Sequence, residues 1–483
     1  MKKIYCNLAL LATMLVMLFG LGACSDDAES LLETVPADSQ VVVTIDGDEW
    51  LKSIDYKNRD GKPTFCPEMD KLLKTTGVDH AMVNNVADAL ELTEKVFVLF
   101  VNGQDAFLTF NVKDADKFRA WVEKHGGKSF ADEGKGFYRL SSGDFVMKDK
   151  QVWASLSGKI ETDRVERFLD LGKKNRFSEK FSGIASSMTG SGRLISGFLN
   201  INEVFSLLHK IGETQTAAQM QFALGMAFKD AAYLTFDASV SSDKSESSLR
   251  VLNKDEEPAE FLIPMSRINT AALNKIDNRA FCVGAIDISP DLTNMLGSLM
   301  KTYGSTMGPE ERAVADTFLS MQGTSAFSVN NADEVLVSLG FKNPEKAQAA
   351  AGIIKGFTSG SMRVGTTGNF VVVGTGKAAN AGSSPKGFGD AYIALYFDYA
   401  NPSMKDIMPV DCSDMGTVLM TLEPDGKGAK LKSVWNVNKP ICTALRLANA
   451  YLDMMSAPRS FSYEDMDEEP YFGDDSTAID FEL

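Results

Sequence analysis

The sequence has little histidine and little cysteine for its length. Its 483 residues include 3 His and 6 Cys. Three histidines leave little material for histidine-based catalysis or for a metal site with several histidine ligands. No GxSxG, HExxH, Walker or EF-hand pattern occurs, and no two cysteines have the CxxC spacing of zinc sites and redox pairs. The motifs therefore predict no enzymatic activity, no cofactor and no metal.

Basic residues are outnumbered by acidic ones. The 49 Lys and Arg residues face 65 Asp and Glu residues, which gives a net charge of −16. A nucleic-acid binder needs a basic face to neutralise phosphates, so no nucleic-acid partner is expected. The 44% hydrophobic and 24% charged residues are typical of a globular chain and exclude wholesale disorder.

A long apolar run is present at the N-terminus. It extends from Leu8 to Leu21 behind Lys2 and Lys3, too short for a transmembrane helix and typical of a signal peptide. It ends in Leu21, Gly22, Ala23 and Cys24, which match the lipobox of bacterial lipoproteins. The match implies that residues 1–23 are a lipoprotein signal peptide and that Cys24 is acylated. Two or three acyl chains would attach the chain stably to a membrane.

Acidic residues follow the predicted anchor directly. The sequence Ser25-Asp26-Asp27-Ala28-Glu29 resembles the acidic export signal of Bacteroidetes-type surface lipoproteins. This resemblance implies a lipid anchor in the bacterial outer membrane and exposure at the cell surface; an anchor that faces the periplasm stays open as the alternative. Residues 24–34 are predicted to be a lipidated acidic linker.

A second resemblance begins at Val35-Pro36-Ala37-Asp38-Ser39, which precedes an apolar strand at 41–46. This segment looks like the start of large Bacteroidetes-type lipoproteins, about 500 residues long and of unknown function. The resemblance is good over the first 50 residues, and over the rest it extends only to the general pattern of segments along the chain. It implies a location and a fold but no chemistry.

Several landmarks occur twice in the same order. The pattern Ile-Asp-x4-Leu around Asp46 returns around Asp287, and the strand and helix cap at 107–117 return at 336–346. A hairpin at 138–147 matches one at 362–372, each with a Gly-Asp or Gly-Asn turn. We therefore predict an α+β fold of two tandem copies of an antiparallel-sheet-plus-helix unit, with helices on one face. Each copy is predicted to have a longer and a shorter subunit. The first copy covers 35–255 and the second copy 265–438. A hinge at 254–259 lies between them, and a C-terminal helix follows at 439–457.

Few side chains qualify as candidate site residues. Asp46 and Asp287 are acids placed alike in both copies, and we expect them to cap the helices that follow. Gly374-Thr375-Gly376 fits a dinucleotide pattern, but a loop rather than a helix is predicted after it, so no cofactor is expected. The predicted mature chain keeps four further cysteines, whose disulfide state the sequence leaves open: Cys66, Cys282, Cys412 and Cys442.

Half of the net charge is concentrated at the C-terminus. Residues 458–483 contain nine acids and one arginine, a net charge of −8 in 26 residues. Such segments are typically disordered and solubilising, and docking onto a basic partner is the alternative. The globular body is then only mildly acidic.

Together these features predict a noncatalytic, lipid-anchored cell-envelope protein that binds a protein or glycan partner. One alternative is a cell-surface hydrolase that acts through carboxylates. The other is an envelope assembly or chaperone-like component, for which exposed methionine-rich grooves are expected.

The lipid anchor gives a first test. Cys24→Ala removes the thiol that would be acylated, so the variant should move from the membrane fraction to the soluble fraction on fractionation of the cells. If the variant still sediments with membranes, the lipoprotein interpretation is wrong.

Overall fold

The computed structural model describes residues 25–59, 62–75, 80–190, 192–303, 307–331, 333–358, 362–375, 387–406 and 411–456. The signal peptide and lipobox predicted at 1–24, and the acidic tail predicted at 458–483, lie outside these residues. Within the described ranges, no helix is both long enough and apolar enough to cross a membrane.

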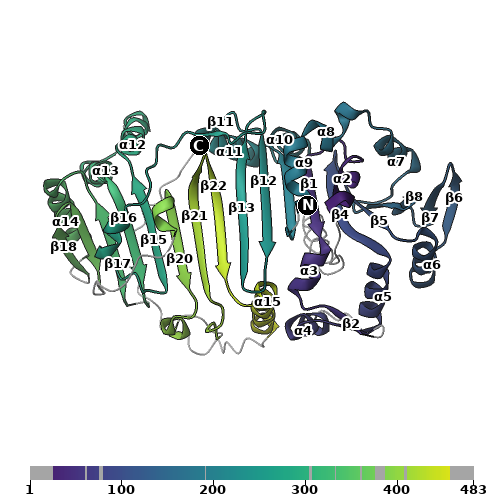
Figure 1. The fold of residues 1–483 in the computed structure, drawn as a ribbon. Helices are drawn as coiled ribbons and strands as arrows, with labels where there is room; N and C mark the ends of the chain where they lie inside the picture. The colour runs from purple at the N-terminus through teal and green to yellow at the C-terminus, as the bar shows by residue number, and fades with distance from the viewer. Residues whose placement is uncertain are drawn as a thin grey trace, which may run out of the picture.

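One large antiparallel sheet of 18 strands organises the chain, and helices pack against it (Figure 1). This confirms the predicted antiparallel α+β class. The strands of the N-terminal half are β1 (Val41–Asp46), β4 (Thr93–Asn102), β5 (Asp105–Val112), β6 (Phe130–Gly134), β7 (Phe137–Leu140), β8 (Phe145–Lys148), β9 (Gln151–Ser155), β10 (Ile195–Asn200), β12 (Tyr233–Val240) and β13 (Lys244–Leu252). Those of the C-terminal half are β15 (Cys282–Ile288), β16 (Gly323–Val329), β17 (Val335–Gly340), β18 (Arg363–Thr367), β19 (Phe370–Gly374), β20 (Ile393–Asp398), β21 (Thr417–Asp425) and β22 (Gly428–Asn436).

Helices lie between most of these strands. In the N-terminal half they are α2 (Ser25–Leu32), α3 (Gly47–Ser53), α4 (Pro67–Thr75), α5 (His80–Glu91), α6 (Ala115–Gly126), α7 (Thr162–Leu169), α8 (Phe177–Lys180), α9 (Ser182–Met188), α10 (Ile201–Lys210) and α11 (Thr214–Ala227). The C-terminal half has α12 (Pro290–Tyr303), α13 (Pro309–Leu319), α14 (Pro344–Phe357) and α15 (Pro440–Ser456). Two small sheets pair β2 (Lys57–Arg59) with β3 (Lys62–Thr64), and β11 (Phe228–Lys229) with β14 (Glu260–Phe261).

The strands of the two halves pair in a similar order. From the middle of the sheet outward, the N-terminal half runs β13-β12-β10-β1-β4-β5-β9-β8-β7-β6. The C-terminal half runs β22-β21-β20-β15-β16-β17-β19-β18. At the position that the β18–β19 hairpin holds in the C-terminal half, the N-terminal half has the β8–β9 hairpin. The sequence instead predicts the β7–β8 hairpin, at 138–147, as its counterpart. The pairing order does not by itself establish a duplication, which stays a prediction.

The two halves join edge to edge through β13 and β22. These strands pair antiparallel from Lys244 opposite Asn436 to Arg250 opposite Lys430. The predicted hinge at 254–259 begins just after β13 and is an ordered turn. Asn253, directly before it, accepts hydrogen bonds at Oδ1 from the Asp255 and Glu257 N–H groups, and a Glu256 carboxylate oxygen accepts one from the Ile184 N–H at 3.0 Å.

Helices cover both faces of the sheet in the N-terminal half, not one face as predicted. Val98 and Phe100 of β4 belong to a core with α2, α7, α8 and α9, whereas the intervening Phe97 belongs to a core with α3, α4 and α6. Side chains of a strand alternate between the two faces, and β4 is apolar at both sets of positions. Its continuous apolar run therefore requires cover on both sides.

The predicted linker at 24–34 is largely a packed helix. Helix α2 begins at Ser25, and its Leu31 and Leu32 are buried against the sheet. The candidate export residues Ser25, Asp26 and Asp27 form its first turn. The described helix therefore begins one residue after the predicted acylation site Cys24, which itself lies outside the described residues.

Candidate functional site

Asp46 caps a helix, as predicted. One of its carboxylate oxygens accepts hydrogen bonds from the Asp48 N–H at 3.0 Å and the Glu49 N–H at 3.2 Å, at the start of α3. Burial raises the pKa of the Asp46 carboxyl, partly offset by these hydrogen bonds. The carboxylate also lines a cavity of about 160 Å³ beside Lys52 and Arg193. Sites for drug-sized ligands typically have about 300–1,000 Å³, so this cavity suits ordered water rather than a large substrate.

Asp287 does not cap a helix, and that prediction is wrong. Its buried carboxylate accepts a hydrogen bond from the Thr324 hydroxyl at 2.6 Å, across the β15–β16 pair. The cap of α12 is Ser289, whose hydroxyl oxygen accepts from the Leu292 N–H at 3.0 Å. Ser289 stands next to Pro290, the first residue of the helix, so its short side chain is the one in position to reach the free N–H groups.

The two aspartates do not form a common site. Strands β1 and β15 are separated by six other strands, and neighbouring strands lie about 4.8 Å apart, so about 34 Å of sheet lies between the two carboxylates. A carboxylate pair for hydrolysis needs a separation of less than about 10 Å.

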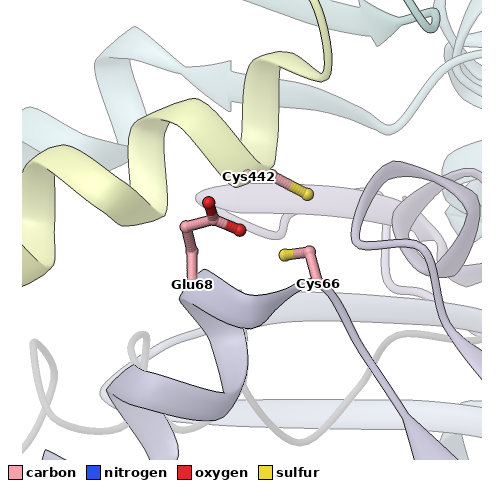
Figure 2. Close-up of side chains that lie close together, drawn as sticks. All are labelled: Cys66, Glu68 and Cys442. Atoms are coloured by element: carbon pink, nitrogen blue, oxygen red, sulfur yellow. The ribbon is translucent and has the colours of Figure 1, made fainter.

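A second cluster is formed by residues that are far apart in the sequence. Cys66 and Cys442 are buried, Glu68 is half-buried, and one ligand atom from each lies within 4.8 Å of the other two. Figure 2 shows both sulfurs and the Glu68 carboxylate directed toward one another. Sequence spacing could not reveal this cluster, because 376 positions separate its two cysteines.

Local backbone structure positions the three side chains. Cys66 directly precedes α4, and its carbonyl accepts from the Met69 N–H at 3.1 Å, so both Cys66 and Glu68 lie at the N-terminal end of that helix. Cys442 lies in the first turn of α15, and its thiol donates to the Ser53 carbonyl at 3.4 Å. Burial raises the pKa of the Cys66 thiol. Burial also raises the pKa of the Cys442 thiol, and a hydrogen bond to Cys66 raises it further.

None of the four described cysteines forms a disulfide. Cys282 is buried in β15, and burial raises the pKa of its thiol to about 11. Cys442 is also buried, but it takes part in the cluster with Cys66 and Glu68, a role that the sequence did not predict.

The middle of the sheet has an apolar surface that the sequence analysis missed. Its strands β12, β13, β22, β21 and β20 lie side by side (Figure 1), and α11 packs at one end of β12 and β13, on Leu234 and Val251. We call this surface the central apolar face. It consists of three rows that run across all five strands: Phe236, Leu249, Leu431, Leu422 and Ile393; Ala238, Ser247, Ser433, Met420 and Leu395; and Val240, Ser245, Trp435, Val418 and Phe397.

The central apolar face contains no charged side chain, whereas the opposite face of the same strands carries ion pairs beside core residues such as Ala394 and Leu252. On that opposite face Lys430 pairs with Glu423 at 3.5 Å, Lys432 with Glu246 at 4.0 Å, and Arg250 with Asp425 at 3.3 Å. An antiparallel sheet with one solvated face normally packs its apolar face against other groups.

In this structure the middle of the central apolar face is not covered by the described residues. Leu431 is 49% exposed, Met420 38% and Ile393 37%. The signal that could have found this surface was the period-2 alternation of β13 and β22, for example Leu431, Ser433 and Trp435 against Lys430, Lys432 and Val434. Alternation predicts an apolar face but does not say whether the same chain covers it.

Other candidates stay outside what the structure describes. Leu21, Gly22, Ala23 and Cys24 are not among the described residues, and neither is Gly376. Gly374 ends β19, the second arm of the hairpin β18–β19, as predicted.

No protein-family model matches the sequence, and no curated protein matches it. Three solved structures show some similarity: crystal forms III, IV and I of TP0453, with 9%, 9% and 8% sequence identity and TM-scores of 0.27, 0.26 and 0.27. The alignments cover 46%, 45% and 72% of this chain, and 78%, 80% and 93% of the TP0453 chain, respectively. With TM-scores this low, the likeness carries no argument about fold or function.

The cap at Asp46 gives a prediction about stability. Asp46→Ala removes the acceptor and should lower the free energy of unfolding by about 1 kcal/mol in chemical denaturation at pH 7. Asp46→Asn keeps an acceptor and removes a partly buried charge, so it should be as stable as the wild type or more stable at that pH.

The same pair of variants gives a pH dependence. The pKa of Asp46 is higher in the folded chain than its usual value of 3.8. Folding therefore takes up a proton at pH values between 3.8 and the pKa of the folded chain. The wild type should therefore lose stability relative to Asp46→Asn as the pH rises through this window. An equal loss for the Asn and Ala variants at pH 7 would contradict the capping role.

Proposed function

We propose that this chain is a noncatalytic, lipid-anchored protein of the bacterial outer membrane that binds another envelope protein through the central apolar face. The observation that carries the proposal is the uncovered apolar surface on five adjacent strands, with Leu431 and Met420 exposed at its middle. Contiguous exposed apolar patches are uncommon on monomeric proteins and mark interaction sites.

The chemistry of the surface favours a protein over a glycan. Sugar hydroxyls require hydrogen-bonding partners, and the three rows offer only the serine hydroxyls of Ser245, Ser247 and Ser433 as side-chain polar groups apart from the Trp435 indole. The indole N–H is already engaged, because it donates to the Met415 carbonyl at 2.7 Å. Apolar side chains of a protein would fit this surface without leaving polar groups unpaired.

The extent of the surface also favours a protein. Five strands span about 19 Å between the outermost two, and three alternate rows span about 14 Å along the strands. These dimensions suit the buried core of a protein–protein interface. The cavities at Asp46 and at Arg446 are lined by charged side chains and by no residue of these five strands.

The anchor is consistent with a surface that works close to a membrane. Helix α2 starts at the residue after Cys24, and its buried Leu31 and Leu32 fix it to the sheet. An acylated Cys24 would therefore hold the folded body near the lipid headgroups, where other anchored proteins are concentrated.

One observation favours the assembly or chaperone-like alternative. Helix α11 packs on Leu234 and Val251, which lie on the same side of β12 and β13 as the central apolar face. Its Met220, Phe222 and Met226 are exposed, so the methionines of this helix are not core filler. Flexible methionine side chains beside an apolar sheet would suit several clients rather than one partner.

Site-specific photo-crosslinking in intact cells tests the proposal. A photoreactive amino acid at Leu431 should yield one recurrent adduct with a different envelope protein, identified by mass spectrometry. The matched control is the same amino acid at Lys432, the next residue of β22, which points to the opposite face and should yield no such adduct. Met420→Lys should abolish the adduct and weaken binding of the purified partner more than tenfold, because it places a charge in the interface.

Three outcomes separate the alternatives. No adduct at Leu431, or equal adducts at Leu431 and Lys432, would overturn a partner site on this face. An adduct of two copies of this chain would replace the proposed partner with self-association. A broad set of adducts that is retained in Met420→Lys would favour the assembly or chaperone-like function.

A further inference from the structure

Three chain segments meet at the cluster of Cys66, Glu68 and Cys442. Helix α3 ends there at Ser53, and α4 and α15 begin there. Further contacts hold the segments together: the Asn449 side-chain amide donates to the Glu68 carbonyl at 2.8 Å, and Lys71 pairs with Asp453 at 2.5 Å. The donor residues thus lie within packed helices or, for Cys66, directly before one (Figure 2).

We propose that Cys66, Glu68 and Cys442 bind one zinc ion, with the two sulfurs and one carboxylate oxygen as protein ligands. Two thiolates favour zinc over calcium and magnesium, which take oxygen ligands, and the carboxylate disfavours copper(I). Three protein ligands leave the fourth tetrahedral position for water, on the side where Glu68 is partly exposed.

The distances fit this donor set. Zinc lies about 2.3 Å from sulfur and about 2.0–2.2 Å from a carboxylate oxygen, so tetrahedral ligands lie about 3.5–3.8 Å apart. The three atoms here already lie within 4.8 Å of one another, and a change of about 1 Å would close the site. Changes of this size are within reach of side-chain rotation alone.

The electrostatic surroundings favour thiolates over thiols once an ion is present. The N-terminal ends of α4 and α15 carry partial positive charge, which stabilises the anionic ligands at both cysteines. Lys439 lies one turn before Cys442 and pairs with Asp55. A divalent ion with two thiolates and one carboxylate would have a net charge of −1, and the Lys439–Asp55 pair beside it adds no net charge.

A disulfide between the two cysteines fits the cluster less well. Thiol–disulfide exchange requires access to the attacked sulfur, and Cys66 and Cys442 are 2% and 4% exposed. A disulfide also gives no role to the Glu68 carboxylate, which has no ion-pair partner among the described residues within 4.0 Å. An ion uses all three groups.

A zinc ion at this position would attach the C-terminal helix to the N-terminal half. The two cysteines are 376 positions apart, and α15 also contacts the C-terminal half, where Nη1 and Nη2 of Arg446 each donate a hydrogen bond to the Asp414 carboxylate. The ion would therefore strengthen the attachment between the halves, in addition to the pairing of β13 with β22 and the side-chain contacts of α15 with α4.

Metal titration of the purified chain tests this inference. The reduced, metal-free protein should bind one equivalent of Zn²⁺ in calorimetry, and Co²⁺ in its place should give the absorption bands of thiolate coordination. Cys66→Ser and Cys442→Ser should each weaken binding more than about 100-fold, and Glu68→Gln by about 10–100-fold. Zinc should also raise the midpoint of thermal unfolding of the wild type and leave that of Cys442→Ser unchanged.

Cys282→Ser is the matched control, because it removes a buried thiol of β15 that is not part of the cluster. Its zinc affinity should equal that of the wild type. The proposal is overturned if the reduced chain binds no zinc, if Cys282→Ser weakens binding as much as Cys442→Ser, or if peptide mapping finds Cys66 and Cys442 joined in the isolated protein. Circular dichroism of each variant separates loss of the site from loss of the fold.

Discussion

The pairing of β13 with β22 is the interaction on which the architecture depends. Each strand ends one half of the sheet, and each is nine residues long. Unpaired, such long edges would be open to pairing with other chains. The antiparallel ladder satisfies both edges at once and places β13 and β22 in the middle of one continuous sheet.

This arrangement accounts for the central apolar face. Helices cover the outer parts of the sheet, on both faces in the N-terminal half, but they do not reach Leu431 or Met420. Complete burial of one such side chain is worth about 1.5–3 kcal/mol. A partner that covers several of them gains enough free energy for specific binding, while the opposite face carries ion pairs such as Lys430 with Glu423.

Local features were predictable from the sequence, and features that depend on long-range contacts were not. The cap at Asp46, the two-residue turn at Gly368 and Asn369, and α15 from Pro440 follow from turn and cap chemistry. Asp287 was misassigned because a neighbouring serine is a better-placed cap. The cluster of Cys66 with Cys442, and the open state of the central apolar face, depend on which distant segments meet, and no local pattern encodes that.

Methionine oxidation in cells tests the central claim, a partner on the central apolar face, most directly. Met420 lies on that face and is 38% exposed, Met362 lies elsewhere and is 42% exposed, and Met147 is buried. With a mild oxidant, the purified chain should form sulfoxide at Met420 and Met362 at similar rates and spare Met147. In intact cells Met420 should be protected while Met362 still reacts; equal oxidation of Met420 and Met362 in cells would contradict the account.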